Sequence, residues 1–370
     1  MGLRLPPRPL IAIVGGSLVA LFVATALFAS VYHEQRAVRA LTHLERGHTL
    51  AAAGELESAV REYRAALSLE RDSIGAEQAL ALTLLSLNRL SEAESYLTEL
   101  LARDPASGPL NRAIARIHAS RGDETQARGA YQRAIYGQWP EQEEAAGERI
   151  ATRFELVRYL RTRSADEEVL AELLRLKAEL SPAETASIRR VASLFTQLNA
   201  GEEAIEALEA AAEEAPRDVE LLAQLADTQA AIGQSTAART TLRRALAVEP
   251  RRADLRDRVA VIERVLALDP TLPRLRLSTR TLRARQLLAA VVAQTRACLE
   301  EAAPPESVAR DQAARRLRLR RPSTVEGAEE ELALALRLWS ASPACQEETP
   351  EARAIAQIMA RVQVPEEPLP

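Results

Sequence analysis

One spacing constrains the fold of this chain more than any other feature: side chains of similar size recur every 34 residues. Ala59, Ala93 and Ala127 follow this interval. The same interval separates the members of four further sets, which are Tyr63, Leu97 and Tyr131; Ala66, Leu100 and Ala134; Leu170, Ala204 and Ala238; and Pro182, Pro216 and Pro250. A fixed period of roughly 20 to 50 residues indicates stacked repeats, in which each unit buries its apolar face against its neighbours.

Each repeat is predicted to be a pair of helices. The chain is rich in Leu, Ala, Glu and Arg, which cost little to place in a helix, and it has only 14 Gly and 19 Pro among 370 residues. No long stretch alternates β-branched and polar residues, so no sheet is expected. Proline lacks a backbone N–H and ends the second helix of a pair, whereas Gly54, Gly122 and Gly233 fall at the turn between the two helices. We therefore predict an all-α fold.

The spacing resembles that of the tetratricopeptide repeat, a helix pair with small residues, one large residue and a closing proline at fixed places. The matching residues are Gly47, Ala59, Tyr63 and Ala66 in the first repeat, and Ala226, Ala238, Leu242, Ala245 and Pro250 in the sixth. The resemblance implies an α-solenoid over residues 33–252. Its six repeats would be 40–73, 74–107, 108–141, 151–184, 185–218 and 219–252.

Two departures interrupt this regular array. Residues 142–150 are extra, and we expect them to lengthen a helix and to bend or offset the solenoid. They are either a simple helical extension or a break between two binding faces. Arg158 and Lys177 stand where the fourth repeat should have small residues, which puts its packing in doubt.

An uncharged N-terminal segment, residues 10–32, predicts a transmembrane helix. At about 1.5 Å per residue its 23 residues reach roughly 34 Å, enough for a hydrocarbon core of about 30 Å. Arg4 and Arg8 precede it, so residues 1–9 should stay in the cytoplasm. The chain is then a single-pass protein of the inner (cytoplasmic) membrane with a periplasmic repeat domain. A cleaved signal peptide is the alternative, since Ala24-Thr25-Ala26 fits a cleavage site.

Residues 253–362 are predicted to form a C-terminal helical capping domain, with helices at 253–268, 278–302, 306–320, 326–340 and 350–362. Residues 363–370 are predicted to be a disordered tail. Cys298 and Cys345, the only cysteines, would form a disulfide in an oxidising compartment or remain two buried thiols.

Positive charge is concentrated late in the chain. The whole chain has a formal net charge of −4, yet residues 251–321 hold 17 Arg against 8 Asp or Glu. The densest stretch contains Arg315, Arg316, Arg318, Arg320 and Arg321. It predicts contact with anionic lipid or an acidic partner surface, or else a solvated helix face. Nucleic acid is disfavoured because no aromatic residues are interleaved for base stacking.

No catalytic motif occurs in the sequence. The four histidines are His33, His43, His48 and His118, and none lies in a zinc-binding H-E-x-x-H pattern. G-x-S-x-G, Walker A, G-x-G-x-x-G and C-x-x-C patterns are also missing from the sequence. We therefore expect a protein that is not an enzyme and that needs no cofactor or metal.

Binding of other proteins is the function that the resemblance implies. Tetratricopeptide arrays commonly hold a peptide or protein along the concave face, which the first helix of each pair lines. Carrying those positions over by register gives Leu44, His48, Arg112, Arg116, Tyr159, Arg189, Gln197 and Asp227. Their arginines suggest an acidic ligand.

We therefore predict a membrane-anchored scaffold or adaptor that assembles or stabilises an envelope or membrane complex. Two alternatives remain open, namely a constitutive structural subunit of one membrane complex, and a regulator of an envelope enzyme such as a cell-wall synthase.

Overall fold

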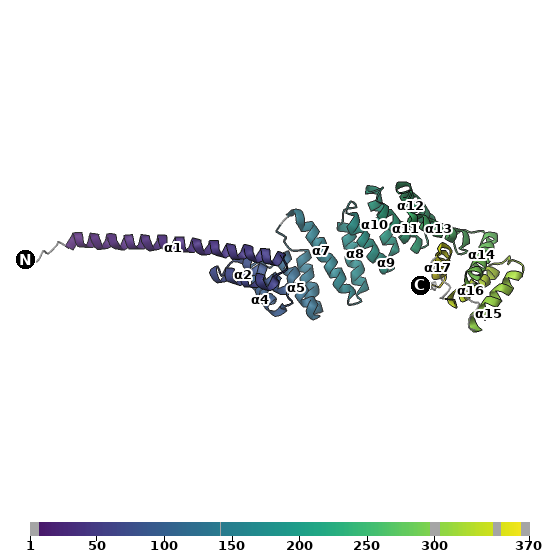
Figure 1. Ribbon diagram of the computed structural model, residues 1–370, viewed down its shortest axis with the longest axis horizontal. Helices are drawn as coiled ribbons and strands as arrows, with labels where there is room; N and C mark the ends of the chain where they lie inside the picture. The colour runs from purple at the N-terminus through teal and green to yellow at the C-terminus, as the bar shows by residue number, and fades with distance from the viewer. Residues whose placement is uncertain (1–6, 141, 297–303, 343–348, 364–370) are drawn as a thin grey trace, which may run out of the picture. The chain divides into compact units, whose positions relative to one another are not determined.

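The computed structural model describes residues 7–140, 142–296, 304–342 and 349–363 (Figure 1). The regular structure in these residues is helical, apart from one isolated bridge between Ser107 and Gln138. The prediction of an all-α repeat fold is thus confirmed for the described part of the chain. By its internal contacts the chain divides into two compact units, Met1–Ala165 and Asp166–Pro370.

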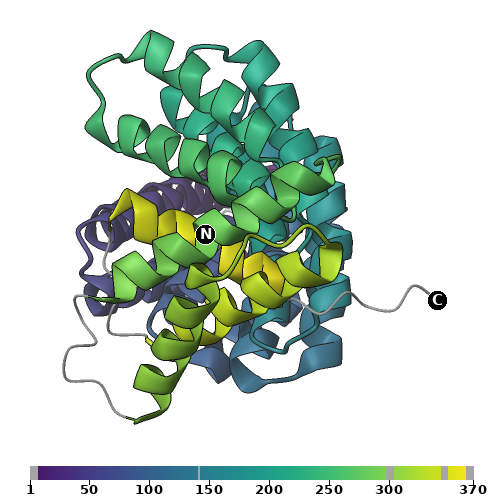
Figure 2. The ribbon, with the colours of Figure 1, turned by 90° about the vertical axis from the view of Figure 1, so that its right-hand side faces the viewer.

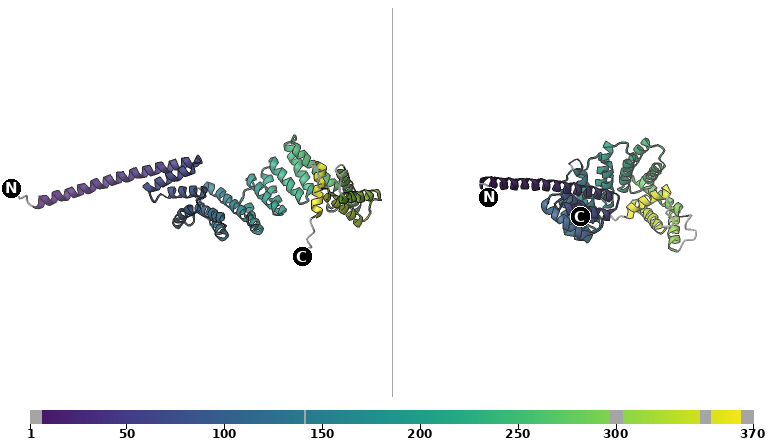
Figure 3. Two further views of the ribbon diagram at one scale, coloured as in Figure 1. Left: turned by 60° about the horizontal axis from the view of Figure 1, so that its bottom comes forward. Right: turned by 60° about the vertical axis from the view of Figure 1, so that its left-hand side comes forward.

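The first unit is a series of antiparallel helix pairs. Its helices are α1 (Pro7–Ala52), α2 (Leu56–Leu69), α3 (Ile74–Ser86), α4 (Leu90–Arg103), α5 (Gly108–Arg121), α6 (Glu124–Ile135) and α7 (Gln142–Arg161). The C-terminal part of α1 packs against α2, and the pairs α3–α4 and α5–α6 follow. The N-terminal part of α1 extends beyond the helices against which α1 packs (Figure 3).

The second unit continues with helix pairs and ends in a different arrangement. Its helices are α8 (Asp166–Glu179), α9 (Thr185–Gln197), α10 (Gly201–Glu214), α11 (Val219–Ala231), α12 (Ser235–Val248), α13 (Ala253–Leu268), α14 (Leu277–Arg296), α15 (Pro304–Arg318), α16 (Val325–Ser340) and α17 (Pro350–Gln363). The last helix, α17, returns to pack against α13 (Figure 2). Val265, Leu287, Trp339 and Ile355 belong to the apolar core that joins these C-terminal helices.

Small side chains let the paired helices approach closely. Ala59, Ala93 and Ala127 are fully buried, each at the same place in its pair. At Gly47 in α1, a Cβ atom would lie 2.4 Å from the ring of Tyr63, which is itself buried in α2. The 34-residue spacing therefore marks the points at which two helices touch.

A left-handed backbone conformation ends the first helix of each pair. Gly54, Gly122 and Gly233 have φ of 80–85°, as their predicted turn positions require. Asn88 and Asn199 take the same role with φ of 58° and 59°, each 34 residues from one of these glycines. Asparagine tolerates this conformation better than most residues, so these turns follow the same rule.

The array changes at the predicted insertion. Residues 142–150 form the first half of α7, so they lengthen a helix as expected. The division between the two units falls after Ala165, inside the fourth repeat predicted at 151–184. Of the two residues that depart from the pattern, Arg158 is exposed, and Lys177 reaches from α8 to Glu206 in α10 at 2.5 Å. Both charges thereby avoid the interior.

Some predicted features find no support or lie outside the described residues. The span predicted at 10–32 falls within α1, but no helix in the described ranges is both long and apolar enough to cross a membrane, so the structure does not support this prediction. Cys298, Cys345 and the tail from residue 364 onward lie outside the described residues, as do residues 1–6.

The contact between Gly47 and Tyr63 predicts a local stability effect. Gly47→Ala should force a fully packed ring to move, at a cost of about 1–3 kcal/mol. Hydrogen–deuterium exchange of the α2 amides should then be at least about fivefold faster. Gly75→Ala is the matched control, because its Cβ would lie 3.8 Å from Leu44, an ordinary contact. Equal protection of α2 in the two variants would contradict the role given to Gly47.

Candidate functional site

A network of charged side chains joins α5 to α7 in the first unit. Arg112 and Arg116 lie one turn apart on α5, and both reach Glu155 on α7. Arg116 donates two hydrogen bonds to the Glu155 carboxylate, from Nε at 2.9 Å and from Nη2 at 2.6 Å. Arg112 donates to Glu155 from Nε at 3.0 Å and to Glu148 from Nη1 at 2.5 Å. One carboxylate therefore serves two guanidinium groups.

The electrostatics of this network favour the ionised carboxylate. Burial alone would raise the pKa of Glu155, but the hydrogen bonds and charges of Arg116 and Arg112 outweigh it and lower the pKa to about 2. Tyr131 lies close by, and burial together with the charge of Glu155 raises its pKa to about 12. The network is thus fully charged at neutral pH, with the tyrosine neutral.

This network changes the interpretation of the predicted arginines. Arg112 and Arg116 were candidates for binding an acidic ligand, but acidic side chains of the same unit already neutralise them. Glu148 belongs to the predicted insertion, and Glu155 lies one helical turn beyond it. The insertion thus supplies an internal partner for the concave arginines. Whether these residues also contact another protein stays a prediction.

Glu155→Gln should destabilise the first unit in a pH-dependent way. The folded pKa of about 2 lies below the usual 4.5, so the stabilisation is complete above about pH 4.5 and is lost as pH falls toward 2. At neutral pH the variant should lose roughly 1–3 kcal/mol, and the loss should shrink toward about pH 3. Urea unfolding followed by the fluorescence of Trp139, in a Trp339→Phe background, reports this unit.

The exposed Glu45 in α1 gives a control of the same charge change within the same unit. Glu45→Gln should leave unfolding unchanged at every pH. A loss for Glu155→Gln that did not vary with pH would show that packing, and not charge, accounts for it.

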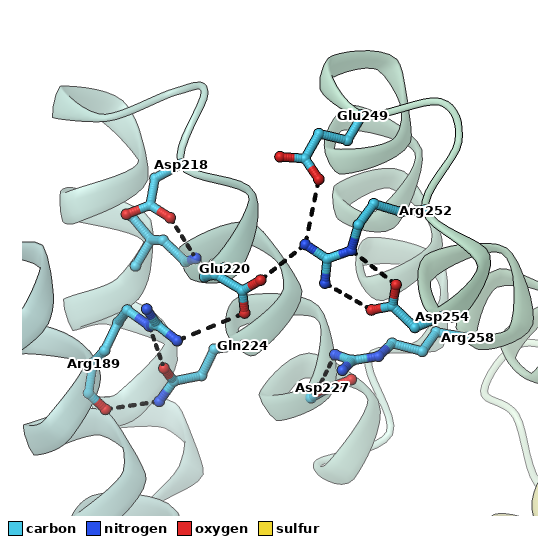
Figure 4. A network of polar contacts seen from close by, with 10 residues as sticks. Arg189, Asp218, Glu220, Gln224, Asp227, Glu249, Arg252, Asp254 and Arg258 are labelled. Atoms are coloured by element: carbon cyan, nitrogen blue, oxygen red, sulfur yellow. Dashed lines mark hydrogen bonds and ion pairs between the residues drawn. The ribbon is translucent and has the colours of Figure 1, made fainter.

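A second polar network crosses the first helices of the pairs in the second unit (Figure 4). Arg189 of α9 and Gln224 of α11 exchange two hydrogen bonds, at 3.1 and 2.7 Å. Arg252, which precedes α13, reaches Glu220 of α11 at 2.8 Å. It also holds Asp254 with two hydrogen bonds of 2.8 Å. The network therefore links three successive helices, α9, α11 and α13.

Asp227 lies at one end of this network, where Arg258 of α13 donates to it at 2.7 Å (Figure 4). Burial among the neighbouring atoms raises the pKa of the Asp227 carboxyl, and Arg258 opposes that rise. The side chain nevertheless keeps 58% of its surface exposed. Asp227 and Arg258 thus form a pair that is still accessible to a bound molecule.

The remaining predicted residues lie at separate places. His48 is within 3.2 Å of the Tyr63 hydroxyl, and Leu44 is half-buried in the same helix, α1. Tyr159 is buried in α7, with its ring beside that of Tyr131. Gln197 is exposed at the end of α9. Leu44, His48 and Tyr159 therefore belong to the first unit, whereas Arg189, Gln197 and Asp227 belong to the second.

A groove of about 540 Å³ lies beside Asp227 in the second unit. Residues of α11, α12, α13 and α17 line it, so the returning C-terminal helix forms one wall. The apolar part of the lining is made by Ala226, Ala230, Ala231, Leu242, Val261, Ile262 and Ala360. The polar part is made by Asp227, Arg258, Arg353, Gln357 and Arg361. The groove thus combines small apolar side chains with several guanidinium groups.

A buried ion pair fixes the wall that α17 provides. Arg361 of α17 reaches Asp269, just after α13, at 3.0 Å, and Asp269 is fully buried. The other carboxylate oxygen of Asp269 accepts hydrogen bonds from the backbone N–H and hydroxyl of Thr271, at 2.8 and 2.6 Å. The sequence analysis identified neither this pair nor the groove, because both depend on where α17 docks.

Metal and acid–base chemistry find no support in this arrangement. Among the described residues, no group of three or more His, Cys, Asp or Glu side chains is placed to hold a metal ion. The charged networks pair arginine with carboxylate, which positions helices and binds polar groups.

The predicted basic stretch lies at the end of α15 and in the turn to α16. Arg316 is half-buried and is paired with Glu330 at 3.0 Å and Glu331 at 3.4 Å. The other four arginines, Arg315, Arg318, Arg320 and Arg321, are exposed. The stretch therefore divides into one structural arginine and four at the surface.

Stacked helix pairs with polar networks along their first helices define a helical-repeat protein. Its repeats are tetratricopeptide repeats, since residues 196–262 match that family. The match runs from the end of α9 into α13 and includes the helices of the second polar network. The tetratricopeptide fold is generally a protein-interaction module. A search of the curated proteins gave no match to the chain.

Several solved structures are similar to this chain. The APC/C hetero-tetramer Cut9-Hcn1 shares 15% identity with it, at a TM-score of 0.35, over 60% of this chain and 42% of the other. This chain thus spans less than half the length of that relative. YrrB, a TPR protein with an unusual peptide-binding site, shares 16% identity at a TM-score of 0.36, over 52% and 94%. PilF of Pseudomonas aeruginosa shares 17% identity at a TM-score of 0.32, over 59% and 92%.

Proposed function

We propose that this protein is a scaffold that binds a segment of another protein in the groove between α11, α13 and α17. The observation that carries the proposal is the groove itself, about 540 Å³ in volume, within the region of tetratricopeptide repeats and beside the predicted binding residue Asp227. Pockets of roughly 300–1,000 Å³ with mostly apolar walls and a few placed polar groups are typical binding sites.

The walls of the groove favour a peptide that carries both apolar and acidic side chains. Small residues such as Ala230 and Ala360 leave room for the side chains of a ligand. Asp227 compensates Arg258, and Asp269 compensates Arg361. Arg353 is exposed on α17 and takes part in no ion pair with another described residue. A carboxylate of the ligand would pair with this guanidinium in the geometry that arginine prefers.

Filling the groove should abolish partner binding without unfolding the protein. A photo-crosslinking amino acid at Gln357, an exposed lining residue, should capture a discrete partner in cells. Ala360→Trp should place an indole in the groove and reduce that adduct by at least about tenfold, which corresponds to about 1.4 kcal/mol. Arg353→Glu should also weaken it, by repelling an acidic ligand.

Ala333 and Arg337 on α16 provide the matched controls, because both are exposed and neither lines the groove. Ala333→Trp and Arg337→Glu should leave the adduct unchanged. An adduct that survives Ala360→Trp would place the binding site elsewhere. The stoichiometry of the captured partner then distinguishes the roles, since a fixed ratio favours a constitutive subunit and a variable one favours an assembly factor or a regulator.

We also propose that the N-terminal part of α1 attaches the protein to the inner membrane, with the repeats on the periplasmic side. The uncharged residues 10–32 support this proposal. So do the large apolar side chains in this part of α1, of which Phe22 and Phe28 are 73% and 77% exposed. An apolar helix surface of this kind needs a covering, which lipid tails supply.

Alkaline carbonate extraction of membranes tests the attachment. The full-length chain should stay in the membrane pellet, whereas a variant without residues 10–32 should be released, because peripheral contacts do not survive this treatment. Replacing residues 166–179 with an unrelated helix of equal length provides a control that should remain in the pellet. Release of the full-length chain would overturn the proposal and leave the groove untouched.

A further inference from the structure

The turn that joins α15 to α16 presents several exposed arginines on a fixed backbone. We define the arginine loop as Arg318, Leu319, Arg320 and Arg321. The side chains of its three arginines, like that of Arg315 one turn earlier, are exposed and form no ion pair or hydrogen bond with another described residue. These positive charges are therefore available to a ligand.

A single buried guanidinium holds the backbone of this loop. Arg285 of α14 donates from Nη1 to the carbonyl oxygens of Leu317, at 2.9 Å, and Leu319, at 3.2 Å. Its Nη2 donates to the carbonyl oxygen of Arg320, at 3.2 Å. The same Nη2 pairs at 2.7 Å with Glu331, which is fully buried. Because the carbonyl groups are directed at Arg285, the loop cannot rearrange freely.

The far end of the loop is also fixed. The Thr324 hydroxyl accepts a hydrogen bond from the backbone N–H of Gly327, at 3.2 Å, and so caps α16. Pro322 packs so closely on Gly327 that a Cβ there would lie 2.5 Å from the proline Cβ. A loop held at both ends loses little conformational freedom when it binds a ligand, which favours binding.

An apolar side chain lies among the arginines. Leu319 is 59% exposed, although leucine is usually buried. An acidic protein surface or a nucleic acid would neutralise the arginines but would leave Leu319 without an apolar contact. The loop also has no aromatic residue on which a base could stack. A lipid headgroup layer offers phosphate groups for the arginines and an acyl boundary for the leucine.

We propose that the arginine loop is a docking site for a membrane surface that contains anionic phospholipid. The guanidinium groups of Arg318, Arg320 and Arg321 would contact lipid phosphates, and Leu319 would insert between headgroups. This contact is separate from the groove beside Asp227 and does not depend on the function proposed for that groove.

The test places a polarity-sensitive fluorophore beside the loop in the full-length chain. Ser323→Cys, with Cys298 and Cys345 changed to serine, allows labelling with nitrobenzoxadiazole and leaves the loop residues intact. Phosphatidylcholine vesicles that contain phosphatidylglycerol should shift the emission to the blue, whereas pure phosphatidylcholine vesicles should not. The probe reports contact at the loop only, so attachment through α1 does not mimic the result.

Reversing the loop charges should remove the signal. Each arginine near an anionic surface contributes about a fivefold effect, equivalent to about 1 kcal/mol, so Arg318→Glu, Arg320→Glu and Arg321→Glu together should weaken the contact by at least about tenfold. The exposed Arg217, Arg244 and Arg251, changed to Glu together, give a control of equal charge change in the same unit. Leu319→Ser should weaken binding while preserving its dependence on salt.

Three results would overturn the proposal. The first is no shift with either vesicle, and the second is an equal shift with both. The third is a shift that heparin or polyglutamate produces but vesicles do not, which would assign the loop to a polyanionic macromolecule. Since the groove variant Ala360→Trp leaves the arginine loop unchanged, a failure here is distinguishable from a failure of the function proposed for the groove.

Discussion

Close approach of paired helices at small residues is the constraint on which the repeat array depends. The fully buried alanines of successive pairs, such as Ala59 and Ala93, leave no room for a larger side chain. At Gly201 in α10 a Cβ would lie 2.3 Å from Ile232, at the end of α11, so glycine serves the same purpose between neighbouring pairs. Because such contacts recur in every pair, the sequence must repeat small residues at one interval, and the repeat becomes legible without a structure.

The same reasoning explains which parts of the fold were predictable. Helix pairs and turns follow from local rules, so the left-handed turn at Gly54 could be placed from the sequence, and that at Asn88 could have been found by adding 34 residues. The rule slips at the fourth repeat. The corresponding left-handed residue is Ser164, with φ of 54°, one residue ahead of the position that precedes Asn199 by 34. The two units divide one residue later, so the loss of register coincides with a loss of continuity.

The polar sites were much less predictable, because their partners come from distant helices. Arg112 and Arg116 were identified as concave residues, but Glu155 lies 43 and 39 residues away, which is not the repeat interval. The insertion sets that separation, and no local pattern encodes it. The groove depends on the docking of α17, which is not part of a repeat. A sequence can reveal which arginines face the inside of the array and still leave open whether they are already neutralised.

Two buried carboxylates set the geometry of both proposed sites in the second unit. Asp269 holds Arg361 and so fixes α17 as a wall of the groove, and Glu331 holds Arg285, which fixes the arginine loop. Removing one partner of a buried pair commonly costs about 3–5 kcal/mol, because the other charge is left without compensation. Arginine therefore has two roles in this unit. Arg285 and Arg361 are buried against carboxylates and position the backbone, and the arginines that this leaves without partners, such as Arg353 and Arg320, are the ones free to recognise another molecule.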